Sequence, residues 1–179
     1  MNIWHDIRPG RIKAEDFYAV IEISKGSKNK YEIDKETGLL MLDRVLYTST
    51  TYPANYGFIP RTYCDDKDPL DVLVMCTESI APMTLVRCFP IGALIMVDGN
   101  EKDEKIIALP YGDPTYSGFR DVSDLPEHIF AEMKHFFSVY KALENKETYV
   151  SEIVGREGAV AIISKAIEQY IDIFCRGKE

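Results

Sequence analysis

The longest apolar run of the chain reads LVRCFPIGALIMV at residues 85–97. Its β-branched and aromatic residues are typical of a buried strand, and Pro90 and Gly92 predict a bend near its middle. The uncharged part, residues 88–97, is ten residues long, whereas a helix needs about 20 apolar residues to cross a membrane. The run therefore predicts a long, bent core strand, and no membrane is expected among the partners.

Shorter runs with strand character lie on either side of this one. They cover residues 17–23, 30–33, 39–44, 72–76 and 106–109, and an interrupted strand or ordered loop is expected over residues 52–60. Gly38 ends the polar turn between two of these runs, where a positive φ closes a hairpin. Several short strands with turns between them predict a small closed or half-closed barrel.

Residues after about 123 have a helical period instead and predict two helices. Asp124 is the expected N-cap of the first helix, with Pro126 at its first position, and Gly177 is the expected stop of the second. Each helix carries one apolar stripe, which we expect to be core or subunit contact. The stripes are Ile129, Phe130, Met133, Phe136, Phe137 and Tyr140, then Ala159, Ile162, Ile163, Ala166, Ile167, Tyr170, Ile171 and Phe174.

Length and composition favour a single domain over residues 1–179. Of the 179 residues, 46% are hydrophobic and 28% are charged, which excludes disorder as the main state. Twenty-nine acidic and 21 basic residues give a net charge of −8, which disfavours nucleic acid as a partner. No signal peptide is recognised, and the four cysteines lack redox or zinc spacing, so a cytoplasmic protein with reduced thiols is expected.

An acidic segment directly precedes the strand expected at residues 72–76. It reads Asp65-Asp66-Lys67-Asp68-Pro69-Leu70-Asp71. Pro69 biases Asp68 towards an extended shape, so the carboxylates can converge on one point. Two carboxylates about 5 Å apart repel by on the order of 3 kcal/mol at an effective dielectric near 20, so such a cluster needs a cation or a shared proton. Oxygen ligands favour Mg²⁺ or Mn²⁺; the alternative is a solvated acidic turn.

A second acidic segment covers residues 98–105 and follows the longest apolar run. Asp98 ends that run, and Asp103 precedes the short strand expected at residues 106–109. Both can therefore lie at one rim of a barrel beside Asp71, which favours a site for several metal ions. The alternative is a charged hairpin tip.

Cations and hydroxyl groups accompany these acids. Arginine binds oxyanions through a planar fork and lysine through a point charge, so together they could bind a compact, highly charged oxyanion. Taken singly, they are surface charges or core aromatics. The candidates are Lys30, Arg44, Tyr52, Tyr56, Lys105, Tyr140 and Lys141.

Several motifs, in order, carry a family resemblance. Residues 22–32, 52–60, 66–74, 98–105, 121–126 and 135–141 resemble the corresponding segments of the soluble family I inorganic pyrophosphatases, including YPxNYGFIP and DxDPxDVLV. The resemblance spans about residues 15–155. Three features depart from the family pattern: Lys67 inside the acidic segment, residues 110–120, and Arg156.

This resemblance implies an α+β, mainly β fold: a five-stranded OB-like β-barrel flanked by two α-helices. It also implies hydrolysis of inorganic pyrophosphate to two orthophosphates with several Mg²⁺ ions per subunit (Mn²⁺ as a substitute), and a homohexamer with His135 at a subunit contact. By position, Asp68 would be the general base, and the metal ligands would be Asp66, Asp71, Asp98 and Asp103. The phosphate ligands would be Lys30, Arg44, Tyr56, Lys105, Tyr140 and Lys141. Glu22 and Glu32 would be supporting groups, to which Tyr52 is added as a hydroxyl donor.

Two other functions stay open at this stage. An OB-like barrel can bind nucleic acid or protein without catalysis, although the charge of −8 and the lack of a basic stripe speak against it. The sequence poorly distinguishes a pyrophosphatase from a metal-dependent hydrolase of another small phosphoester. A P-loop NTPase or serine hydrolase has little support, because their glycine-rich loop and nucleophile elbow are missing.

Overall fold

A computed structural model describes residues 2–99 and 101–176 of the chain. Gly177, the expected stop of the second helix, lies outside the described residues. In chain order the elements are η1 (Pro9–Arg11), β1 (Ile12–Lys13), β2 (Asp16–Ile23), β3 (Asn29–Ile33), β4 (Leu40–Val45), β5 (Asn55–Phe58), β6 (Asp71–Val74), β7 (Leu85–Asp98), β8 (Glu101–Pro110), η2 (Pro114–Tyr116), η3 (Val122–Asp124), α1 (Glu127–Val139), η4 (Ala142–Glu144), β9 (Thr148–Gly155) and α2 (Arg156–Phe174).

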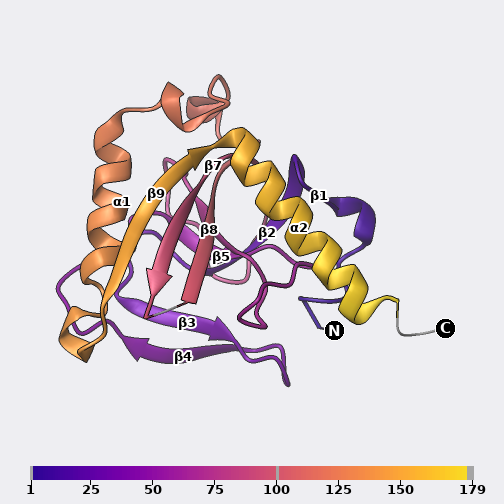
Figure 1. Cartoon of the computed structure of the whole chain (residues 1–179), viewed down its shortest axis with the longest axis horizontal. Helices are drawn as coiled ribbons and strands as arrows, with labels where there is room; N and C mark the ends of the chain where they lie inside the picture. Colours follow the sequence, from indigo (N-terminus) through magenta and orange to yellow (C-terminus); the bar gives the residue numbers. More distant parts are fainter. Residues whose placement is uncertain (1, 100, 177–179) are drawn as a thin grey trace.

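Five strands form a closed ring. They pair in the order β2-β5-β6-β8-β7, and β7 pairs back onto β2. All these pairings are antiparallel except that of β6 with β8, which is parallel. The β3–β4 hairpin lies below the ring in Figure 1, with α1 and α2 on opposite sides. The expected five-stranded OB-like architecture with two flanking helices is confirmed.

Two glycines allow strands to approach each other closely, Gly57 within the ring and Gly92 between β7 and β9. A Cβ on Gly57 of β5 would lie 1.8 Å from the Val20 carbonyl oxygen on β2, so only glycine lets these strands approach. A Cβ on Gly92 of β7 would lie 2.6 Å from the Val154 carbonyl oxygen. The β7 register also shifts between Pro90 and Gly92, which confirms the bend expected there.

Alternate residues of the strands face two different apolar clusters. Leu73 and Ile107 belong to the cluster that contains the α1 side chains Phe130, Met133, Phe136 and Phe137. Val72 and Ile106, their neighbours along β6 and β8, belong to the cluster that contains Ala159, Ile163 and Ala166 of α2. Both helices thus bury most of the stripes expected from the sequence, although Ile171 of α2 is exposed, and each helix packs on its own side of the ring.

The turn of the β3–β4 hairpin follows the sequence expectation. Gly38 has a φ of 73°, and its N–H donates to the Asp34 carbonyl oxygen at 2.8 Å. The side chain of Asp34 accepts the Thr37 N–H at 3.1 Å, which fixes the tip. The hairpin therefore has a defined shape and can carry functional side chains.

Three local expectations were wrong. The Asp124 carboxylate accepts the Asp121 and Arg120 N–H groups within η3, and Pro126 occupies the cap position of α1 instead. An unexpected strand, β9, lies between the helices, where it pairs with β7. Strand β8 begins at Glu101, because its charged residues continue the pairing with β7, so Asp103 lies within the strand.

No helix in the described part of the chain is both long enough and apolar enough to span a lipid bilayer.

Candidate active site

The acidic segment forms a tight turn that leads into β6. The Asp68 N–H donates to Asp66 Oδ1 at 3.0 Å, and the Cys64 N–H donates to the Asp68 carbonyl oxygen at 2.9 Å. Lys67 has a φ of 70°, and its side chain is exposed and lines none of the pocket described below. The turn therefore presents Asp66 and Asp68 at the surface, and the unusual lysine lies outside the pocket.

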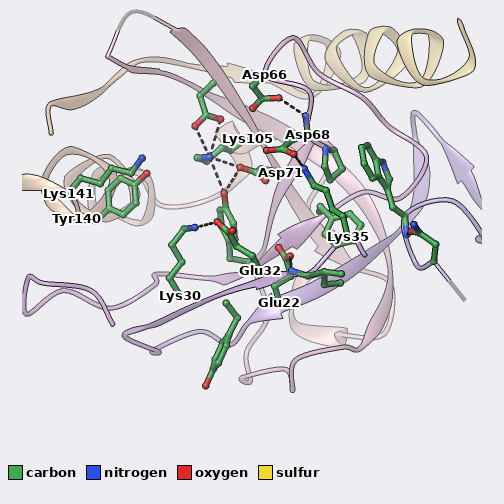
Figure 2. Close-up of a pocket in the computed structure, with 18 residues that line it drawn as sticks. Glu22, Lys30, Glu32, Lys35, Asp66, Asp68, Asp71, Lys105, Tyr140 and Lys141 are labelled. Carbon is green, nitrogen blue, oxygen red and sulfur yellow. Dashed lines mark hydrogen bonds and ion pairs between the residues drawn. The ribbon is translucent and has the colours of Figure 1, made fainter. Parts of the chain in front are cut away.

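Lys105 is the buried centre of the site. Its side chain is only 3% exposed, and the parallel pairing places Lys105 opposite Asp71. Its Nζ lies 2.7 Å from Asp71 Oδ2 and 3.0 Å from both Asp103 carboxylate oxygens. The Tyr56 hydroxyl, 3.0 Å from Nζ, donates to the same Asp71 oxygen. Two carboxylates, one ammonium and one phenol thus share a single hydrogen-bonded cluster (Figure 2).

The charged groups in this cluster shift one another's pKa values. Burial alone would lower the pKa of Lys105, but Asp71 and Asp103 outweigh it and hold the pKa above its usual value. Burial also raises the pKa of Asp103, as does the charge of Asp71, while Lys105 opposes that rise. Lys105 therefore keeps its positive charge.

Glu22 is a buried carboxyl that forms no ion pair with any of the described residues. Its Oε1 accepts the Ile33 N–H at 2.8 Å. Burial, together with the charges of Asp71 and Glu32, raises the pKa of Glu22 to about 8. A carboxyl so strongly disfavoured as an anion would gain much from a nearby cation.

Lysines from two separate elements form the wall of the site that lies across from Asp66 and Asp68. Lys30 on β3 pairs with Glu32 and with Asp43, whose Oδ2 lies 2.8 Å from Nζ. Lys141, just beyond α1, pairs with Asp98 at the end of β7. Figure 2 shows Lys30, Tyr140 and Lys141 on the side of Lys105 opposite to Asp66 and Asp68.

Most of these groups line one pocket of about 310 Å³. Eleven of the fourteen residues selected from the sequence line it: Glu22, Lys30, Glu32, Tyr56, Asp66, Asp68, Asp71, Asp103, Lys105, Tyr140 and Lys141.

The other three do not line the pocket. Arg44 is held at its edge by Asp43 and Glu144, and Asp98 reaches it only through Lys141. Tyr52 is 2% exposed and its ring packs at a tilt against those of Tyr56 and Phe136, so it is a core residue. Burial raises the pKa of Tyr52, which agrees with that role.

Sequence reasoning missed part of the lining. Lys35, in the β3–β4 turn, pairs with Asp68, and its Nζ lies 5.5 Å from the centre of the Trp4 ring. Asn2 and Trp4 bring the N-terminal segment to the pocket, where the Trp4 Nε1–H donates to the Thr62 carbonyl oxygen at 2.9 Å. These residues belong to none of the motifs, and nothing in their spacing places them beside the acidic turn.

In this arrangement no group of three or more His, Cys, Asp or Glu side chains within residues 2–99 and 101–176 is placed to hold a metal ion. The donor chemistry nevertheless fits a divalent cation, because Asp66, Asp71 and Asp103 bring carboxylate oxygens into one pocket beside the uncompensated Glu22. Lys105 pairs with Asp71 and Asp103, and Lys35 pairs with the neighbouring Asp68.

A closed β ring whose pocket combines clustered carboxylates with lysines and phenols is suited to an enzyme that binds a small polyanion through bridging cations. The family pattern of inorganic pyrophosphatases matches residues 19–171. The chain therefore belongs to the family of soluble inorganic pyrophosphatases, and the enzyme class expected from its sequence, an inorganic diphosphatase, is confirmed.

Individual relatives agree over nearly the whole chain. Soluble inorganic pyrophosphatase 2 of Chlamydomonas reinhardtii is 48% identical over 93% of this chain and 87% of its own length. Soluble inorganic pyrophosphatase 1 of Arabidopsis thaliana is 46% identical over 94% of this chain and 80% of its own. The solved inorganic pyrophosphatase of Helicobacter pylori superposes with a TM-score of 0.85 at 46% identity, covering 88% of this chain and 95% of that one. That of Thermus thermophilus gives 0.87 at 36% identity, covering 95% and 99%.

Proposed function

We propose that this protein hydrolyses inorganic pyrophosphate to two orthophosphates with Mg²⁺ as cofactor. The observation that carries the proposal is the cluster of Asp71, Lys105, Asp103 and Tyr56, which places opposite charges within 3.0 Å of one another at the base of the pocket. A site with both signs of charge can bind a cation and a phosphate oxyanion side by side.

The carboxylates supply the cation sites in this proposal. Several Mg²⁺ ions, with Mn²⁺ as a substitute, would be held by Asp66, Asp71, Asp98 and Asp103, and supported by Glu22 and Glu32. Bound Mg²⁺ would neutralise phosphate charge and make a water molecule easier to deprotonate. The family resemblance implies that Asp71 would be shared by two ions, and the Tyr56 hydroxyl and Lys105 both orient this carboxylate.

Asp68 is the proposed general base. Its side chain is 52% exposed within the pocket, and its backbone is fixed by the turn that joins it to Asp66 and Cys64. It would accept the proton of the attacking water while the water oxygen bonds to one phosphorus and the bridging P–O bond breaks. Lys35 must release Asp68 for this, which costs little because both side chains are half exposed.

The cations would bind the phosphate oxygens. Lys30 and Lys141 line the pocket, and Lys105 remains protonated at its base. The Tyr56 and Tyr140 hydroxyls add neutral donors. These groups are preorganised, so they can stabilise the charge that develops on the leaving phosphate.

Phosphate release by the purified protein tests the proposal. We expect rapid release from pyrophosphate with Mg²⁺, loss of activity with EDTA, and little release from ATP. Equal release from ATP would favour a broader phosphoester hydrolase, and no release from pyrophosphate between pH 6 and 9, with Mg²⁺ or Mn²⁺, would favour a binding module.

We also propose that the chain folds as a single domain over residues 1–179 and forms a cytoplasmic homo-oligomer, a hexamer. Exposed apolar residues on the β3–β4 hairpin, among them Leu39 and Leu42, and the exposed His135 on α1 are available for subunit contacts. The four cysteines are free, as expected for a reducing compartment. Sedimentation velocity tests the assembly.

A further inference from the structure

Glu144 lies outside the pocket, beside the wall that carries Tyr140 and Lys141. It ends η4, the 3-10 turn that follows these two residues, and its N–H donates to the Lys141 carbonyl oxygen at 3.0 Å. Asn145 closes the turn with a left-handed φ of 56°. The Glu144 carboxylate therefore has a fixed position relative to the lysine wall.

The partner of Glu144 is Arg44, on β4. The Arg44 Nε lies 3.1 Å from Glu144 Oε1, and the two side chains are only 20% and 11% exposed. Arg44 Nε and Glu144 Oε2 are shielded from solvent, and neither has a hydrogen-bond partner in the part of the chain that the structure describes. Burying polar atoms in this way costs free energy, so stability alone does not explain the pair.

Asp43 links the Arg44 guanidinium to Lys30, which lines the pocket. Asp43 Oδ2 lies 2.5 Å from Arg44 Nη1 and 2.8 Å from Lys30 Nζ, and Lys30 is opposite Arg44 in the hairpin. Figure 1 shows the end of β4 beside the turn that follows α1. Lys30, Asp43, Arg44 and Glu144 thus form a continuous row of alternating charge from β3 to the turn that follows Lys141.

In this row the guanidinium is held on two sides. Asp43 engages Nη1 and Glu144 faces Nε, whereas Nη2 has no hydrogen-bond partner among the described residues. When an arginine is already oriented on two sides, its remaining N–H groups can bind an anion without a further loss of side-chain entropy.

We propose that Glu144 is a positioning residue for the phosphate site, acting through Arg44. The inference rests on the proposed function. Glu144 holds the guanidinium at the edge of the pocket in register with Lys30, so that both cations meet the same anion. Without Glu144, Arg44 keeps only Asp43 and loses its orientation, which weakens substrate binding more than it slows the chemical step.

A double-mutant cycle tests this coupling. We expect Glu144→Ala to raise the KM for pyrophosphate about fivefold while kcat changes less than about twofold, and the same substitution in an Arg44→Ala background to change KM less than about twofold. Glu144→Gln keeps an oxygen that faces Nε, so its KM should lie between those of wild type and Glu144→Ala. Glu147→Ala, an exposed acid three residues away, is the matched control and should leave KM unchanged.

Two results would overturn the inference: an equal effect of Glu144→Ala in both backgrounds, or a lower Tm with an unchanged KM. A wild-type chain that releases no phosphate would contradict the proposed function instead. In that case wild type, Glu144→Ala, Arg44→Ala and the double variant are titrated with inorganic phosphate by calorimetry, which needs no turnover. Glu144→Ala must then weaken phosphate binding only where Arg44 is present.

Discussion

The Asp71 carboxylate and the Lys105 ammonium face each other across the parallel pairing of β6 and β8, with Nζ 2.7 Å from Oδ2. The closed ring places this pair at the base of the pocket, and Asp103 adds a second carboxylate from two residues earlier on β8. The cluster is therefore part of the fold as well as of the site, because it neutralises charge that the ring partly buries.

Replacing Lys105 tests that double role. Lys105→Met leaves Asp71 and Asp103 without their shared cation, so the free energy of unfolding in EDTA should fall by about 3 kcal/mol. Added Mg²⁺ should recover part of this loss, since it can take the place of the ammonium charge. Urea denaturation with EDTA and with Mg²⁺ measures both effects. Lys102→Met, an exposed lysine on the same strand, should be nearly neutral; a similar loss there would contradict the argument.

Asp68→Asn tests the general base. The amide keeps the size of the side chain and cannot accept the proton of the attacking water, so kcat should fall by roughly 10²-fold or more while the Tm is unchanged. Steady-state kinetics and a thermal melt give the two values. The matched control is Asp65→Asn, whose carboxylate pairs with Gln169 and Lys165 of α2 instead of lining this pocket. Near-normal turnover in Asp68→Asn would remove this residue from the mechanism.

These two substitutions also show where sequence reasoning succeeds. The acidic turn and its strand lie within a few residues of each other, so local spacing was enough to bring Asp66, Asp68 and Asp71 together. The strands and helical stripes followed from their periods in the same way. Long-range placement was less accessible: Lys35 and Trp4 reach the pocket by tertiary packing, and Arg44 stays at its edge because Asp43 and Glu144 hold it.

Sequence reasoning missed strand β9 for a similar reason. Residues 148–155 lie between two strongly helical segments and carry Ser151 and Glu152 within a run of β-branched residues. Their pairing with β7 decides their conformation, and that pairing joins residues 50 (Asp98 and Thr148) to 63 (Gly92 and Gly155) positions apart in sequence.

Glu22 should make the metal-free protein less stable as the pH rises. Its pKa is raised from 4.5 to about 8 in the folded protein, so the unfolded chain ionises first. Wild type should therefore lose stability relative to Glu22→Gln between about pH 4.5 and pH 8, with a constant difference above that range. Thermal melts in EDTA across this range measure it, and Mg²⁺ should flatten the profile by favouring the carboxylate. Glu36→Gln, which replaces an exposed acid in the β3–β4 turn, is the control. A stability difference between wild type and Glu22→Gln that does not change with pH would contradict the burial argument.

Asp113, which does not line the pocket, should show the opposite dependence of stability on pH. Its carboxylate accepts the Thr77 N–H at 2.8 Å, the Thr77 hydroxyl at 3.0 Å and the Thr115 N–H at 3.0 Å, and these bonds lower the pKa of Asp113 to about 2. A lowered pKa contributes stability that is complete above the unfolded value of 3.8 and is lost as the pH falls through about 2. Asp113→Asn should therefore lower the urea midpoint at pH 7, and the gap to wild type should narrow between pH 4 and pH 2. Glu147→Gln, an exposed acid, should show no gap at either pH, and a gap for Asp113→Asn that persists undiminished in acid would mean that the lost stability came from packing and not from the ionised carboxylate.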